Sequence, residues 1–221
     1  MNPNIEKKLK QIVETSTKKT AIEEWRTAAE KQRVPLYNYR LDHIEEVVDL
    51  AKEIASGTEA NMEVVVLAAW LHDLAKPGIG GISAQHHGIA SAELAEEILT
   101  EEKVSPEIIN QVTDVIRKHV GLTISEPLKP IEAQVLWEAD KILKLGMVGL
   151  IQGILNGVRL FPGRSLFEMG NNLLEFLPLA SDIVKCIVTE RGREVAEERL
   201  NTFKELTKSL QNEINLGKQG E

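Results

Sequence analysis

The sequence predicts an all-α protein, and three observations support this fold class. Apolar residues recur every three or four positions along most of the chain, as they do on one face of an α-helix. No segment alternates apolar and polar residues as a half-buried strand does, and the sequence has no strand–helix–strand rhythm. Breaks at Gly57, Pro77 and Pro106 divide the pattern into segments of helix length.

The first half of the chain contains the most regular segments. Residues 4–32 are charged, with apolar positions at helical spacing, and predict one or two surface helices. Residues 42–55 form an amphipathic pattern that predicts a helix with one buried face. Residues 61–76 are mostly apolar, so we expect a central helix that ends before Pro77. The glycine-rich residues 78–81 predict a loop, either a lid or a plain connector.

The second half continues the helical pattern with clearer boundaries. A helix is expected at about residues 86–100. The segment 105–120 opens with Ser-Pro-Glu, which supplies an N-cap, a proline at the first helical position and an acid in the first turn. Residues 131–146 predict another helix, after which four glycines thin out the helical pattern. A turn at 161–164 and two more helices complete the expected order.

The composition argues against several classes of function. A net charge of −8 and a pI of about 5.3 argue against a general nucleic-acid binder, so we expect no nucleic-acid duplex as partner. The longest apolar run, Val64–Leu71, is far shorter than the roughly 20 residues of a membrane span. The first residues lack the apolar core of a signal peptide. Cys186 is the only cysteine, which suits a reducing compartment. We expect a cytoplasmic protein with no membrane partner; its oligomeric state is not predicted.

Six ionisable residues stand out because they fall on the apolar faces or at the ends of predicted helices. Any one of them fits a hydrogen-bonded core residue or, for an aspartate, a surface or capping residue. Together they could meet inside a helical bundle and bind a metal. The pattern alone leaves both interpretations open. The six residues are His43, His72, Asp73, His87, His119 and Asp140.

The order of these residues resembles the H…HD…D signature of the HD-domain superfamily of metal-dependent phosphohydrolases. The HD pair lies in the segment LHDLAK, and the segments HHGIASAELAEEIL, VIRKHVG and EADKILKLG are similar to those that carry the family's further histidines and its closing aspartate. The resemblance covers roughly residues 40–160. It implies a helical bundle that is one domain overall: an N-terminal helical extension (1–35), an HD-domain core (36–160) and a C-terminal helical appendage packed on the core (161–221).

The resemblance also implies a site for divalent transition metals, two in the six-ligand branch, of the kind Fe, Mn, Zn, Ni or Co. In that branch Asp73 bridges the two metals. Of two adjacent histidines, His87 stands where the family's motif places the ligand; His86 is then a neighbour of the site or a substrate contact, although the two roles could be exchanged. The implied ligands are His43, His72, Asp73 and Asp140 for the first metal, and Asp73, His87 and His119 for the second.

The implied function is a metal-dependent phosphohydrolase that cleaves a phosphate ester or anhydride of a nucleotide-like small molecule. A metal-activated water is the expected nucleophile, and Asp73 is counted as catalytic. Four neutral histidines, two aspartates and two divalent metals carry a net charge of +2, which attracts a small phosphorylated substrate. The sequence lacks the tyrosine-proline signature of the cyclic-di-GMP phosphodiesterases, which argues against a cyclic dinucleotide. Two alternatives stay open, a mixed-valence di-iron oxygenase and a non-catalytic metal- or nucleotide-sensing module.

Three basic residues are candidates for contacts with the substrate. Lys76 lies four residues after His72, hence on the same face if the helix continues so far, and is a candidate phosphate clamp with a catalytic role. A lysine that faces the dipole at the helix end is the alternative. Arg159 and Arg164 flank a turn beyond the metal region, where they either reach the leaving group or, as the simpler interpretation, lie at the surface.

Overall fold

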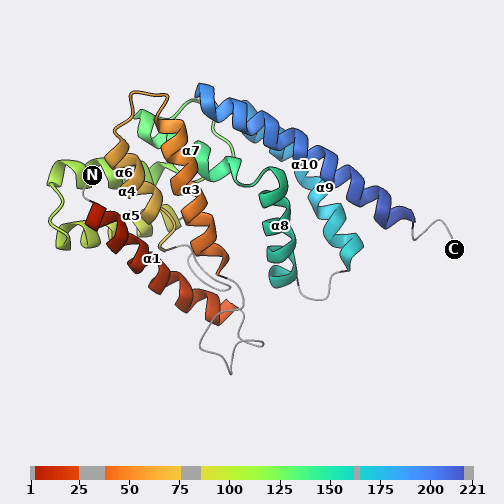
Figure 1. Ribbon diagram of the computed structural model, residues 1–221, viewed down its shortest axis with the longest axis horizontal. Helices are drawn as coiled ribbons and strands as arrows, with labels where there is room; N and C mark the ends of the chain where they lie inside the picture. The colour runs from red at the N-terminus through yellow and green to blue at the C-terminus, as the bar shows by residue number, and fades with distance from the viewer. Residues whose placement is uncertain (1–2, 25–37, 76–85, 162–164, 217–221) are drawn as a thin grey trace. The chain divides into compact units, whose positions relative to one another are not determined.

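The fold is all-α, as the sequence predicts. The computed structural model describes residues 3–24, 38–75, 86–161 and 165–216, and in these ranges it contains nine helices and no strand (Figure 1). The helices group into two compact units, residues 1–139 and 140–221, and helix α7 passes from the first unit into the second.

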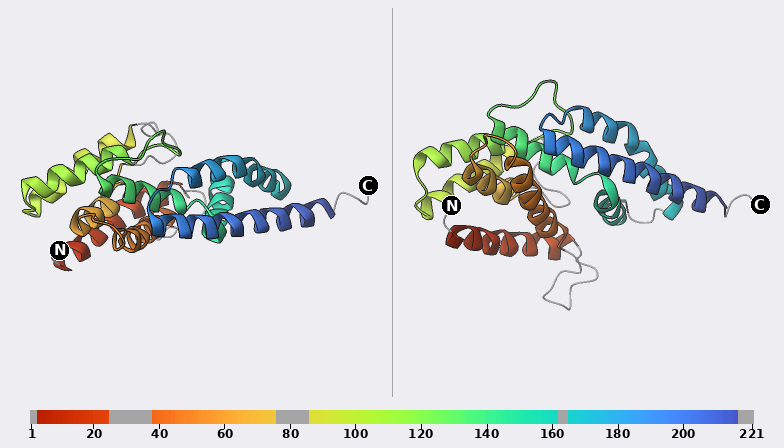
Figure 2. Two further views of the ribbon diagram at one scale, coloured as in Figure 1. Left: turned by 90° about the horizontal axis from the view of Figure 1, so that it is seen from above. Right: turned by 45° about the horizontal axis from the view of Figure 1, so that its top comes forward.

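The first unit is built from two packed helix pairs and a helix that covers one of them. α3 packs on α4 and α5 packs on α6, and the second pair runs side by side in Figure 1 and in both views of Figure 2. α1 lies against α3 and α4, and the start of α7 also belongs to this unit. The bounds are α1 Pro3–Glu24, α3 Tyr39–Ala55, α4 Met62–Leu71, α5 His87–Glu101, α6 Pro106–Lys118 and α7 Ile131–Ile142.

α4 is the central helix of the first unit, since it contacts α1, α3, α5 and α6. Every residue from Val64 to Leu71 is buried, so the helix is apolar around its whole circumference. Asn61 fixes its start, because its side-chain oxygen accepts the N–H of Glu63 at 3.0 Å. The chain that leaves the end of α4 therefore starts from the most enclosed part of this unit.

α3 shows the amphipathic pattern that the sequence predicts. Its opposite side carries charges that pair with α1: Lys52 lies 2.5 Å from Glu6, and Lys10 of α1 lies 2.6 Å from Glu45. These pairs are partly exposed, so they fix the register of the two helices more than they add stability. The buried stripe faces the core and consists of Ile44, Val47, Val48, Ala51, Ile54 and Ala55.

α4 and α6 end in the same way, and both end earlier than predicted. The sequence predicts helices to residues 76 and about 120, whereas the structure ends them at residues 71 and 118. In each case a histidine follows, and its Nδ1 lies close to the carbonyl oxygen three residues earlier: 2.7 Å for His72 on Ala69 and 2.6 Å for His119 on Ile116. A further helical turn would need that same carbonyl. The side chain takes the place of the next backbone N–H, and the helix stops.

The second unit contains three helices and the end of α7. α9 and α10 run antiparallel and side by side (Figures 1 and 2), and both contact α8. α9 begins with a capping box in which Ser165 and Glu168 bond each other's backbone N–H groups. The bounds are α8 Gly146–Leu160, α9 Leu166–Lys185 and α10 Glu190–Leu216.

The glycine-rich segment, whose helical pattern is thin in the sequence, is helix α8. Its stability comes from packing, because glycine itself disfavours a helix interior. A Cβ added at Gly153 would lie 3.1 Å from Cδ2 of Leu173, so the missing side chain lets α8 and α9 approach closely. At the start of the helix, Gly146 has φ +70°, a conformation that suits glycine.

None of the described helices is, by itself, both long and apolar enough to cross a membrane. The bent pair Ile131–Ile142 and Gly146–Val158 reaches the required length and composition when its two halves are counted together.

Candidate metal centre

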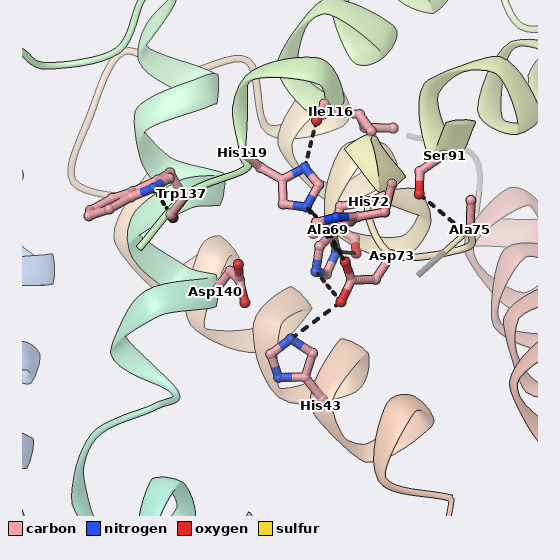
Figure 3. A network of polar contacts seen from close by, with 12 residues as sticks. His43, Ala69, His72, Asp73, Ala75, Ser91, Ile116, His119, Trp137 and Asp140 are labelled. Atoms are coloured by element: carbon pink, nitrogen blue, oxygen red, sulfur yellow. Dashed lines mark hydrogen bonds and ion pairs between the residues drawn. The ribbon is translucent and has the colours of Figure 1, made fainter. Parts of the chain in front are cut away.

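Five of the six ionisable residues singled out in the sequence lie together in the first unit. Figure 3 labels His43, His72, Asp73 and His119 of this cluster. His43 comes from α3, and His72 and Asp73 come from the turn that follows α4. His87 is the first residue of α5, and His119 follows the last residue of α6. All five are buried, the most exposed being His87 at 8%. The four helix ends or faces therefore converge on one enclosed cluster.

The carboxylate of Asp73 lies at the centre of this cluster. Its Oδ1 is 3.4 Å from Nε2 of His87 and 3.5 Å from Nε2 of His119. Its Oδ2 is 3.6 Å from Nε2 of His72 and 3.9 Å from Nε2 of His43. Each carboxylate oxygen thus faces its own pair of imidazoles, and all four rings present the same nitrogen to it.

The helix-ending hydrogen bonds also fix the tautomers of two rings. A carbonyl oxygen can only accept, so Nδ1 of His72 donates to Ala69 and Nδ1 of His119 donates to Ile116. In the neutral ring Nε2 is then left with its lone pair, and it points at Asp73. This is the arrangement of metal-binding histidines, whose second ring nitrogen donates to a carbonyl or carboxylate.

Gly88 allows the approach of His87 to His119. A Cβ at Gly88 would lie 2.5 Å from Cγ2 of Val120, so any other residue would displace either the side chain of Val120 or the start of α5. With glycine there, the two Nε2 atoms lie 3.1 Å apart.

The five residues fit a divalent transition metal. Two sets of three, His43–His72–Asp73 and Asp73–His87–His119, each offer ligand atoms that lie within 4.8 Å of one another. Ligands bound at about 2.1 Å stand roughly 3.0–3.4 Å apart on a tetrahedral or octahedral ion, which is close to the shorter separations here. Nitrogen and carboxylate donors together suit transition metals better than calcium. Asp73 belongs to both sets.

The sixth residue, Asp140, lies on α7 and is 2% exposed. Figure 3 shows it on the same helix as Trp137. The ammonium of Lys141, itself buried, contacts its carboxylate, and Nζ of Lys144 lies 3.5 Å from its Oδ1. The sequence reasoning missed both lysines, because a lysine on a helix is usually solvated; the only signal was their position one and four residues after the aspartate.

The remaining predicted residues lie elsewhere or outside the described ranges. His86 is exposed at the N-cap of α5, while its neighbour His87 belongs to the cluster. Lys76 and Arg164 fall outside the described residues, and so does the side chain of Arg159 on α8. Since α4 ends at Leu71, the helical register that would put Lys76 on the face of His72 does not continue through residues 72–75.

Solved structures with the same arrangement of helices support the fold. The Bacillus subtilis protein YpgQ in complex with ADP has a TM-score of 0.62 and 23% identity, and the match covers 79% of this chain and 88% of YpgQ. An HD-superfamily hydrolase from Bacillus thuringiensis has a TM-score of 0.67 and 18% identity, over 97% of this chain and 99% of the hydrolase. A Lactobacillus plantarum protein gives 0.62 and 16% identity, over 95% and 98% of the two chains.

Sequence comparison matches two parts of this chain to known proteins. A tRNA (cytidine(56)-2'-O)-methyltransferase from Thermoplasma volcanium is 30% identical over 87 residues, which is 39% of this chain. The chain spans only 22% of the length of that protein. The sequence model of the HD domain matches residues 40–145, the range that contains all six of the residues singled out above. Over residues 40–145, this chain is therefore similar to the HD domain.

Proposed function

We propose that this protein is a metal-dependent phosphohydrolase that cleaves a phosphate ester or anhydride of a nucleotide-like small molecule. The observation that carries the proposal is the convergence of four imidazole Nε2 atoms on the carboxylate of Asp73. A nucleotide-like substrate is supported by YpgQ, a protein of similar fold whose structure holds ADP. The phosphorylated substrate and the hydrolytic reaction are part of the proposal.

The proposed ligand assignment follows the two faces of Asp73. We assign His43, His72, Asp73 and Asp140 to a first metal, and Asp73, His87 and His119 to a second. The division of the histidines into one pair near Oδ2 and one pair near Oδ1 supports a bridging carboxylate. Bound divalent metals would supply a water that is deprotonated near neutral pH and a positive field for the phosphoryl oxygens.

The residues of the chain prepare this chemistry in three ways. The Nδ1–H bonds of His72 and His119 hold both rings with the Nε2 atom toward Asp73, so these two rings already present the nitrogen that would bind a metal. Burial of the cluster lowers the local dielectric and strengthens the attraction between bound cations and an anionic substrate. The two aspartates offset only part of the charge of two metals, so the site stays positive.

A hydrolysis screen tests the proposal. Purified protein is incubated with Mn²⁺, Co²⁺, Ni²⁺, Zn²⁺ or Fe²⁺ and a panel of nucleoside mono-, di- and triphosphates together with p-nitrophenyl phosphate. We expect phosphate or pyrophosphate release that needs the metal and disappears in Asp73→Ala. Oxygen consumption together with a mixed-valence di-iron EPR signal would instead indicate an oxygenase. Tight nucleotide binding without turnover under any metal would indicate a sensing module.

A further inference from the structure

The second unit contains a cavity of about 330 Å³ between α8 and α9, with Phe203 of α10 in its wall. This volume lies at the lower end of the range of about 300–1,000 Å³ that is usual for small-molecule sites. The described residues that line the cavity all fall within 144–203, which is part of the second unit.

The cavity exists because the facing sides of two helices do not fill their interface. On α8 the inward positions follow the helical spacing 149, 152, 153, 156 and 157, but they are occupied by glycine and amide residues. On α9 the matching positions 169, 172, 173 and 176 include one amide, Asn172, among apolar residues. A helix interface selected only for packing would place larger aliphatic side chains at such positions.

The fold does not require every one of these glycines. A Cβ at Gly149 would lie 2.2 Å from the backbone of Lys144, so that glycine is dictated by the turn before α8. A Cβ at Gly153 would lie 3.1 Å from Cδ2 of Leu173, so a side chain there would require Leu173 to shift slightly. A Cβ at Gly157 would lie 3.8 Å from Sδ of Met169, which is an ordinary contact. Alanine would therefore fit at Gly157 and would favour the helix. Packing of α8 against α9 therefore does not explain why residue 157 is a glycine and leaves space beside it.

The walls match a flat heterocycle that carries hydrogen-bonding groups. Gln152 and Asn172 each offer both a donor and an acceptor, as the edge of a nucleobase requires. The ring of Phe176, which packs edge-to-face on Phe203 with centroids 5.9 Å apart, supplies an aromatic surface. No carboxylate is among the described residues that line the cavity, although the chain as a whole has a net charge of −8.

Lys144 places a positive charge at one end of the cavity. It is the one cationic residue among the described lining residues, and its Nζ lies 3.5 Å from Oδ1 of Asp140, which we assign as a metal ligand. A phosphate at this end of the cavity would meet the ammonium of Lys144. We infer that the cavity binds the nucleoside part of a nucleotide-like ligand, an inference that rests on the proposed function because that function supplies the class of ligand.

Calorimetric titration with phosphate-free nucleosides tests the cavity without any reaction. The full-length protein, treated with a chelator, is titrated with adenosine, guanosine, cytidine and uridine. We expect at least one nucleoside to bind, and Asn172→Leu and Gly157→Leu each to weaken that binding by about ten-fold, the loss of one or two hydrogen bonds or of the occupied space. Asn201→Leu, at an exposed amide on α10, is the matched control and should bind as the wild type does. Gly157→Ala gives a smaller weakening and replaces Gly157→Leu if the leucine variant does not fold.

Two outcomes overturn the inference: none of the four nucleosides binds, or the folded Asn172 and Gly157 variants bind them as tightly as the wild type. Hydrolysis of p-nitrophenyl phosphate, which has no base, separates this failure from failure of the proposed function. Metal-dependent hydrolysis of that ester without nucleoside binding overturns the cavity assignment and leaves the phosphohydrolase. Nucleoside binding that depends on Asn172, without hydrolysis of any phosphate, overturns the phosphohydrolase and supports the cavity as a binding site.

Discussion

Nε2 of His87 lies 3.1 Å from Nε2 of His119, although the two rings belong to different helices and stand 32 residues apart in the chain. His119 presents a lone pair at that nitrogen because its Nδ1 donates to Ile116. Either the ring of His87 donates its proton across this gap, or both nitrogens face a shared cation. Oδ1 of Asp73 lies 3.4 Å from Nε2 of His87 and 3.5 Å from Nε2 of His119. The oxygen and the two nitrogens thus offer three ligand atoms to one cation.

We therefore expect His87→Ala and His119→Ala each to lose about one metal ion per chain while the helix content stays the same. Metal content is measured by elemental analysis of the purified variants, and helix content by circular dichroism. His86→Ala is the matched control, because His86 is exposed beside the cluster. Full metal occupancy and full activity in both variants would show that these two residues are core histidines; loss in the His86 variant alone would reverse the assignment within the adjacent pair.

Asp73→Ala should empty the whole site and abolish activity, since both of its oxygens face imidazole pairs. The exposed Asp49→Ala on α3 removes a carboxylate of the same type and should change neither property. Elemental analysis and the hydrolysis assay are made on the same preparations. Wild-type metal content with wild-type turnover in Asp73→Ala would contradict the bridging role.

Gly88→Ala should destabilise the first unit by about 1–3 kcal/mol, the usual cost of overpacking, because the new methyl group would meet Cγ2 of Val120 at 2.5 Å. The same displacement moves His87 from His119, so metal affinity should fall as well. Urea denaturation measures the first effect and metal titration the second. Truncation of the opposing side chain in the double variant Gly88→Ala/Val120→Ala should restore much of both; no recovery would mean that the contact is not the cause.

Removal of the metal should lower the melting temperature, because a ligand that binds only the folded state stabilises it. The wild type is heated with and without a chelator, and Asp73→Ala is heated under the same two conditions. We expect the chelator to lower the melting temperature of the wild type and to leave that of Asp73→Ala unchanged. Equal shifts in the two proteins would mean that the chelator acts away from the site.

Lys76→Ala should lower kcat/KM by about 10–1000-fold, or roughly 1.4–4 kcal/mol, with metal content unchanged, if this ammonium clamps the phosphate. The prediction now rests on sequence position alone, since α4 ends at Leu71 and Lys76 lies outside the described residues. Lys118→Ala is the control, because its ammonium is paired with Asp114 at the exposed end of α6. A change in kcat/KM below about two-fold would assign Lys76 to the surface.

Periodicity in the sequence was sufficient to predict the helices that bury one face. The stripe of α3 that contains Ile44, Val47 and Ile54 is buried as predicted, because a 3.6-residue period leaves few other ways to cover it. α8 was harder to predict, since its glycines weaken the local signal and its stability depends on a contact with α9, which no local window contains. The expected domain boundaries stay a prediction.

The sequence was sufficient to single out the residues of the candidate site, but not to predict where the helices that carry them end or which side chains pair with them. The inward positions of His43, His87 and Asp140 follow from the same periodicity that defines the core. The ends of α4 and α6 do not follow from periodicity, because a ring nitrogen of His72 or His119 hydrogen-bonds a backbone carbonyl that the next helical turn would use. Helix-propensity scales do not include such bonds between a side chain and the backbone. Lys141 was missed for a related reason: its burial depends on a partner carboxylate and not on its own polarity.

The burial of α4 on every side affects how metal binding is lost when the protein unfolds. The amide hydrogens of a helix covered on every side exchange with deuterium only when the surrounding structure opens as a whole, whereas frayed helix ends exchange through small fluctuations. The turn that carries His72 and Asp73 starts at the last residue of this helix, so its position depends on a helix that is buried on every side. Heat or denaturant should then remove metal binding and the protection of α4 in one cooperative step, and partial loosening of the outer helices should leave the central carboxylate in place.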